Sequence, residues 1–115
     1  DEGVILLTPF NTDAQDEKTK SFVSKYNEKY GEAPNQFAAD AYDCVYAIYQ
    51  ALTESGVALD ASASDMCDAL IAQFTSPNFV FDGLTGEGMT WSESGEVTKS
   101  PKGMVIQNGA YVGMD

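Results

Sequence analysis

The chain has 115 residues, of which 43% are hydrophobic and 21% are charged, a composition typical of one packed globular domain. Eighteen acidic residues stand against six basic ones, and the net charge of −12 excludes nucleic acid as a partner, because phosphate binding requires a basic surface. The absence of histidine excludes His-based catalytic triads and most zinc sites.

The two cysteines, Cys44 and Cys67, are too few and too widely spaced to form a metal site. We expect them to be small buried hydrophobic residues, and a disulfide between two packed helices is the alternative. No apolar run approaches the ~20 residues of a membrane span. The N-terminus lacks a basic region followed by an apolar one, so we expect no signal peptide here, and Asp1 indicates a mature form or a fragment.

The beginning of the chain predicts a strand followed by a helix. Residues 4–7 are apolar and Thr8-Pro9 ends the run, which predicts a short buried strand. A polar loop follows over residues 11–15. Residues 16–30 predict an amphipathic helix, because one face carries Phe22, Val23, Tyr26 and Tyr30.

A second helix is predicted over residues 36–55. Asn35 is a suitable N-cap, and Gly31 and Pro34 separate this helix from the first. Nearly all of its side chains outside one narrow polar stripe are apolar, so we expect neighbouring elements to cover it on several sides. The polar stripe consists of Gln36, Asp40, Asp43 and Gln50.

A third helix is predicted over residues 63–74. Ser62 and Ser64 are both N-cap candidates, and Pro77 ends the region. The residues spaced for burial on one face of this helix are Met66, Ala69, Leu70 and Phe74.

The last third of the chain predicts β structure. Residues 79–81 and 89–91 have the composition of short strands, and three glycines between them indicate a sharply bent connection. Asn108-Gly109, between residues 104–106 and 110–112, is the strongest short signal for a hairpin. The predicted order is an N-terminal strand, three helices and then β-hairpins, so the predicted fold class is α/β.

The junction of the first two helices, residues 26–43, is the most informative segment for function. The second helix opens with the aromatic Phe37 beside the free backbone N–H groups of a helix N-terminus. Such a place suits a small anion that has an apolar body. This pattern favours a small-molecule-binding protein over an enzyme. Pairs of acids that could suggest acid–base chemistry are interpreted as exposed helical residues, namely Asp40 with Asp43 and Asp65 with Asp68.

Two motifs, in the same order and with the same spacing, resemble the last third of the branched-chain amino-acid binding proteins. The first follows the pattern F-x-x-x-Y-x-x-x-Y-G-x-x-P-x-x-F-A-A-x-x-Y-D-A-V, and the second follows F-x-G-x-T-G and then F-D-x-x-G-D. The residues that carry the resemblance are Phe22, Tyr26, Tyr30-Gly31, Pro34, Phe37-Ala38-Ala39, Tyr42-Asp43, Val45, Phe81-Asp82-Gly83-Leu84-Thr85-Gly86 and Trp91-Ser92-Glu93-Ser94-Gly95-Glu96.

This resemblance implies a fragment of a type I periplasmic-binding-protein fold, in which two α/β lobes are joined by three crossings. The chain, residues 1–115 as a single unit, would be the C-terminal segment, with hinge crossings near residues 11–15 and 93–102. The first strand and residues 103–112 would belong to the second lobe. The helices and the hairpin over residues 79–91 would belong to the first lobe.

The resemblance also implies site residues. Phe37 matches a family aromatic that lines the ligand cleft, and a simple core role is the alternative. Asp40, one turn further on, could meet a ligand ammonium group, and a solvated or interlobe acid is the alternative. Tyr42 matches a family aromatic and is interpreted as packing. The family's principal contacts to the ligand come from earlier parts of the receptor. No catalytic residue, metal or cofactor is expected.

The implied function is that of the substrate-binding component of an ABC transporter for amino acids or similar small polar solutes. Its partners would be the small-molecule ligand and an ABC permease. Its location would be extracytoplasmic, either periplasmic or lipid-anchored at the cell surface. The alternative is an extracellular ligand-sensing domain with the same fold. The fragment alone should bind little or no ligand, and its uncovered apolar helix and strand edges predict a homodimer or swapped assembly.

Overall fold

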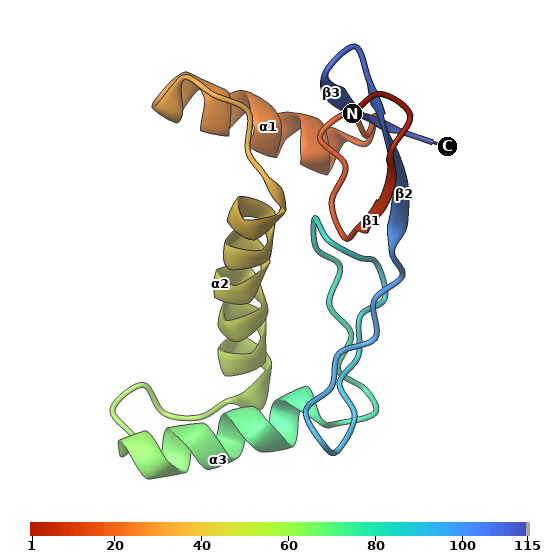
Figure 1. Ribbon diagram of the computed structural model, residues 1–115. Coiled ribbons are helices and arrows are strands. Elements are labelled where there is room, and N and C mark those ends of the chain that lie inside the picture. The colour runs from red at the N-terminus through yellow and green to blue at the C-terminus, as the bar shows by residue number, and fades with distance from the viewer. Residues whose placement is uncertain (115) are drawn as a thin grey trace.

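The computed structural model describes residues 1–114. The elements follow the order that the sequence predicts and confirm the α/β class, with three helices and one antiparallel sheet. Their bounds are β1 (Ile5–Thr8), α1 (Glu17–Tyr30), α2 (Gln36–Ser55), α3 (Ala63–Phe74), β2 (Lys102–Gln107) and β3 (Ala110–Gly113). In Figure 1, α1 and α3 lie across opposite ends of α2, and the segment after α3 returns along α2 to reach the sheet.

Local capping sets the helix bounds. The carboxylate of Asp16 accepts a hydrogen bond from the Thr19 N–H, so Asp16 is the N-cap of α1 rather than its first helical residue. Asn35 caps α2 in the same way, and Ser62 caps α3. Gly31 ends α1 with a φ of 74°, in the left-handed region where glycine has no steric penalty. The bounds of α2 and α3 are those predicted.

The sheet has the order β1-β2-β3, and both of its pairs are antiparallel. The predicted hairpin is confirmed: Asn108 and Gly109 have φ values of 53° and 76°, as a two-residue hairpin turn of type I′ requires. The expectation of a buried first strand is wrong for residues 1–114, because Ile5 and Leu7 are 62% and 70% exposed. Side chains alternate along a strand, and only one face of β1 is covered by other residues.

The segment between α3 and β2 differs from the prediction. Residues 79–81 and 89–91 do not form two regular strands; they form one isolated bridge, in which Phe81 and Met89 exchange two backbone hydrogen bonds of 3.0 Å. A second bridge joins Trp91 to Val97. Phe79, Phe81 and Met89 are nevertheless buried, whereas Val80 is exposed.

Two small hydrophobic clusters hold the molecule together. One places Phe79, Phe81 and Met89 against α2, with Leu70 and Phe74 of α3 at its edge. The other joins the chain before α1 to α1, α2 and the loop near residue 84, through Phe10, Phe22, Ala39 and Leu84. Residues 75–101, which we call the returning segment, therefore pack against α2 along most of the length of this helix.

The buried face of α2 is built from small residues and one acid. Ala39, Asp43, Ala47 and Ala51 recur every four residues on this face. The bulky apolar side chains point elsewhere, and Val45 and Tyr49 are each 67% exposed. The expectation that α2 is covered on several sides is wrong for residues 1–114, because the returning segment covers only this one face.

Both expectations for the cysteines are also wrong. Cys44 and Cys67 are exposed and not bonded to one another. No helix in the described part of the chain is long and apolar enough to cross a bilayer.

Candidate functional site at the start of the second helix

The first turn of α2 presents an aromatic side chain beside backbone N–H groups that have no partner within residues 1–114. The Asn35 side chain accepts from the Ala38 N–H at 3.0 Å, which leaves the N–H groups of Gln36 and Phe37 without an intrahelical partner. The Phe37 side chain is 70% exposed, so the alternative of a core role does not hold within residues 1–114. An exposed apolar ring beside free N–H groups can contact a ligand that combines an apolar body with an anionic group.

Gln36 ties this helix start to the sheet. The Thr8 hydroxyl donates to Gln36 Oε1 at 2.8 Å. Thr8 is buried and is the last residue of β1. The site therefore lies where the sheet meets the helical part of the molecule, as Figure 1 shows at the upper end of α2.

Asp40 lies one turn beyond Gln36 and is already paired. Lys99 Nζ donates to Asp40 Oδ1 at 3.1 Å, and the lysine belongs to the segment that leads into β2. Asp40 Oδ2 has no hydrogen-bond partner within residues 1–114. The structure thus brings Phe37 and Asp40 to the same end of α2, with one carboxylate oxygen of Asp40 available.

Asp43 has a role that the sequence interpretation missed. It was expected to be an exposed helical acid, and that expectation is wrong, because its side chain is buried. Oδ1 accepts from the Leu84 N–H at 2.8 Å, while Oδ2 accepts from the Thr85 N–H at 2.8 Å and the Thr85 hydroxyl at 2.7 Å. The carboxylate therefore fixes the loop at residues 83–85 against α2.

Gly83 is required by the same arrangement. A Cβ atom added at Gly83 would lie 2.5 to 2.7 Å from the carboxylate atoms of Asp43, which is closer than real contacts allow. A sequence signal for the buried acid existed in the spacing, since Asp43 continues the four-residue repeat of Ala39, Ala47 and Ala51.

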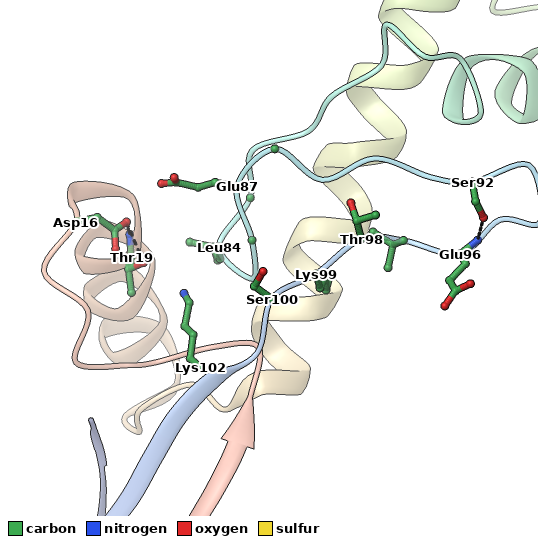
Figure 2. Close-up of a pocket in the computed structure, with 14 residues that line it drawn as sticks. Asp16, Thr19, Leu84, Glu87, Ser92, Glu96, Thr98, Lys99, Ser100 and Lys102 are labelled. Atoms are coloured by element: carbon green, nitrogen blue, oxygen red, sulfur yellow. Dashed lines mark hydrogen bonds between the residues drawn. The ribbon is translucent and has the colours of Figure 1, made fainter. Parts of the chain in front are cut away.

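An open groove of about 930 Å³ is lined by residues of the segment 92–102, of the loop 83–88 and of the start of α1. Figure 2 shows polar and charged side chains around it, with Lys102 extending toward the start of α1. Burial raises the pKa of Asp16, but hydrogen bonds from Thr19 and the charge of Lys102 outweigh it, so the net pKa is lowered. Phe37 does not line this groove, but Lys99, which pairs with Asp40 at the start of α2, does.

The remaining acids within residues 1–114 do not gather into a metal site. Asp65 and Asp68 are both exposed, as expected for helical surface residues. Within residues 1–114, no group of three or more Cys, Asp or Glu side chains is arranged to hold a metal ion.

Comparison with known proteins places this geometry in a family. A family model described as periplasmic binding protein matches residues 1–109. A protein assigned to branched-chain amino acid ABC transport, from Rhodospirillum rubrum, is 31% identical, with a TM-score of 0.70 over 98% of this chain and 31% of its own. None of the curated proteins matches the chain.

Two further solved structures show the same relationship. The leucine-binding protein LivK from Thermotoga maritima is 25% identical, with a TM-score of 0.73 over 99% of this chain and 30% of its own. The branched-chain amino acid transporter substrate-binding protein LivJ from Streptococcus pneumoniae, in complex with isoleucine, is 27% identical, with a TM-score of 0.70 over 93% of this chain and 28% of its own. The chain spans about 30% of the length of these relatives and matches a fragment of their type I fold. The resemblance found in the sequence is confirmed, and the chain belongs to the periplasmic binding protein family.

Proposed function

We propose that the chain is the C-terminal third of a two-lobed, non-catalytic receptor that delivers amino acids or similar small polar solutes to an ABC permease. The family match over residues 1–109 supports this, as do relatives named for leucine and isoleucine binding. The observation that carries the proposal is the exposed Phe37 ring beside the free N–H groups at the start of α2. The receptor would work outside the cytoplasm, in the periplasm or lipid-anchored at the cell surface.

The division between lobes follows the sheet. We assign β1, β2 and β3 to the second lobe, and the helices with the returning segment to the first lobe. The two hinge crossings would lie near residues 11–15 and 93–102. This division is supported by the two hydrophobic clusters, which contain residues of the helices and loops but none of the three strands. Closure around a ligand would then be a hinge motion between lobes.

The ligand would lie against the start of α2. Its apolar side chain would pack on Phe37, and its carboxylate would be near the N–H groups of Gln36 and Phe37. Asp40 Oδ2, which has no partner within residues 1–114, would offer an acceptor for the ligand ammonium group, since Lys99 donates to Oδ1. Because the opposite wall of the cleft is supplied by other parts of the receptor, this chain alone should bind weakly or not at all.

Calorimetry separates the two parts of the proposal. The whole receptor is titrated with a panel of free amino acids, and binding of at least one is expected. The 115-residue chain is titrated with the same panel as the matched control. A dissociation constant below the micromolar range for the chain alone would contradict its role as an incomplete cleft, and a whole receptor that binds none would contradict the proposed function.

The exposed apolar face of α2 determines how the chain behaves alone. Val45, Ile48 and Tyr49 are 67%, 45% and 67% exposed, and together they form one face of the helix. An apolar face of this kind favours association. We therefore assign a homodimer or swapped assembly to the isolated chain, and a monomer in light scattering at high concentration would contradict this.

A further inference from the structure

Two polar contacts join consecutive turns of α2 to the end of β1 and to the segment that leads into β2. The first is the 2.8 Å hydrogen bond from the Thr8 hydroxyl to Gln36 Oε1. The second is the 3.1 Å ion pair from Lys99 Nζ to Asp40 Oδ1. Thr8 ends β1 and pairs in register with Lys102, the first residue of β2, while Lys99 lies three residues before it. Both contacts are therefore beside the point where the chain passes between the helical part and the sheet.

Two contacts restrain an angle, whereas one contact restrains only a position. Gln36 and Asp40 are four residues apart on α2, so they lie on one face about 6 Å apart along the helix axis. The buried cluster that contains Phe10 and Ala39 already limits rotation of α2 relative to the sheet, and the two polar contacts add to that limit. The second contact, one turn further along, opposes that rotation.

We propose that Lys99 and Gln36 are positioning residues that hold the start of α2, and with it Phe37, at a set angle to the sheet. In a two-lobed receptor this restraint limits how far the lobes open before a ligand arrives, an assignment that rests on the proposed function. The angular restraint itself is a property of residues 1–114 and does not depend on any ligand. Asp40 would then have two roles. Its Oδ1 accepts the hydrogen bond from Lys99 that restrains the angle, and its Oδ2 remains available for the ligand.

The restraint is a weak one, as a moving hinge requires. The side chains of Lys99 and Asp40 are 29% and 37% exposed, so salt screens their attraction. Pairs of this exposure change equilibria by about 1.4- to 5-fold, which shifts a distribution of lobe angles without locking it. A receptor whose binding-competent arrangement becomes less populated loses affinity in proportion to that population.

The angle can be measured by pulsed electron-spin resonance on the chain, in a Cys67→Ser background and diluted with unlabelled chain so that distances between copies do not contribute. One spin label is placed on the exposed native Cys44 of α2 and the other on Gln107→Cys in β2. Lys99→Met should broaden the distance distribution, and Lys99→Arg should restore it. The control Lys25→Met should leave it unchanged, because Lys25 forms no ion pair within residues 1–114.

The salt dependence of the distance distribution distinguishes an ion-pair restraint from a role of Lys99 in packing alone. At about 1 M salt, where the screening length falls to about 3 Å, the unaltered chain should acquire the broader distribution of the Lys99→Met variant. Thr8→Val, which removes the other contact, should broaden the distribution by itself and further when combined with Lys99→Met. Identical widths for the unaltered chain and both variants would overturn the proposal.

The whole receptor tests the link to ligand binding. Lys99→Met should raise the dissociation constant for the bound amino acid by about two- to fivefold at low salt, and Lys25→Met should not. A broadened distribution with an unchanged dissociation constant would overturn the coupling between the restraint and ligand affinity. A receptor that binds no amino acid would instead contradict the proposed function, while the spin-label measurement still decides whether the restraint exists.

Discussion

Replacing Asp43 by alanine should destabilise the protein more than the loss of any other acid in it. The carboxylate accepts three hydrogen bonds from two backbone N–H groups and one hydroxyl, all of them buried. Each buried donor left unpaired costs about 1–3 kcal/mol, and entry of water favours the lower end of this range. We therefore expect Asp43→Ala to lower the free energy of unfolding by about 3–5 kcal/mol, a large part of the about 5–15 kcal/mol typical of a domain.

Urea unfolding followed by circular dichroism measures this loss. With a slope of about 2 kcal/mol per molar urea, the midpoint should fall by about 1.5–2.5 M. Asp68→Ala on the exposed surface of α3 is the matched control and should stay within about 0.5 kcal/mol of the unaltered protein. A loss below about 1 kcal/mol for Asp43→Ala would refute the reasoning that the three donors depend on this carboxylate.

Gly83 provides a second test of the same contact. Gly83→Ala should be destabilising in the unaltered protein, because the added Cβ would lie 2.5 Å from Asp43 Oδ2. In the Asp43→Ala background, where that atom is absent, the same substitution should cost much less. Additive effects of the two substitutions would contradict a direct contact between them.

Three further predictions concern the cap of α1 and the surface of α2. Asp16→Ala should lower the free energy of unfolding by about 1 kcal/mol at neutral pH, and Asp16→Asn should keep the cap. Folding lowers the pKa of Asp16 below its ordinary value of 3.8, so its carboxylate stabilises the fold above pH 3.8. This stabilisation is lost as the pH falls through the folded-state pKa. A stability difference between Asp16→Ala and the unaltered protein that persists unchanged at lower pH would contradict this cause. Phe37→Ala should leave the free energy of unfolding within about 0.5 kcal/mol of the unaltered protein, because the ring is exposed. The same substitution should weaken amino-acid binding by the whole receptor. A large loss of stability in urea would instead indicate a core role for Phe37. Val45→Glu should shift the isolated chain toward monomer in light scattering, because it places charge in the exposed apolar face, whereas Glu54→Gln near the end of the same helix should not.

Features decided by neighbouring residues could be predicted from the sequence. The helix bounds follow from the caps at Asn35 and Ser62, each of which bonds to a residue three positions away. The Asn108-Gly109 turn likewise depends only on its own backbone. Phe37 could be placed at a helix start for the same reason, but the sequence left open whether its ring lies in the core or at the surface.

Features decided by distant residues could not be predicted. The donors to Asp43 lie 41 and 42 residues further along the chain, so the spacing with Ala39, Ala47 and Ala51 could place Asp43 on the buried face but could not identify its partners. The pairing of Asp40 with Lys99 spans 59 residues. The exposure of Ile5 depends on which elements lie beside β1, and the local apolar pattern cannot distinguish a covered strand from an uncovered one.

The pairing of β1 with β2 has a consequence for the order of folding. Ile5 lies opposite Val105, so forming this pair closes a loop of about 100 residues, and such distant contacts are entropically costly and slow to form. The β2–β3 hairpin is joined by two residues, and hairpins of this kind form within about 1–10 μs. We therefore expect the hairpin to exist first as a template and β1 to join it last. During that interval, the open edge of β2 would be the part of the chain most exposed to mispairing.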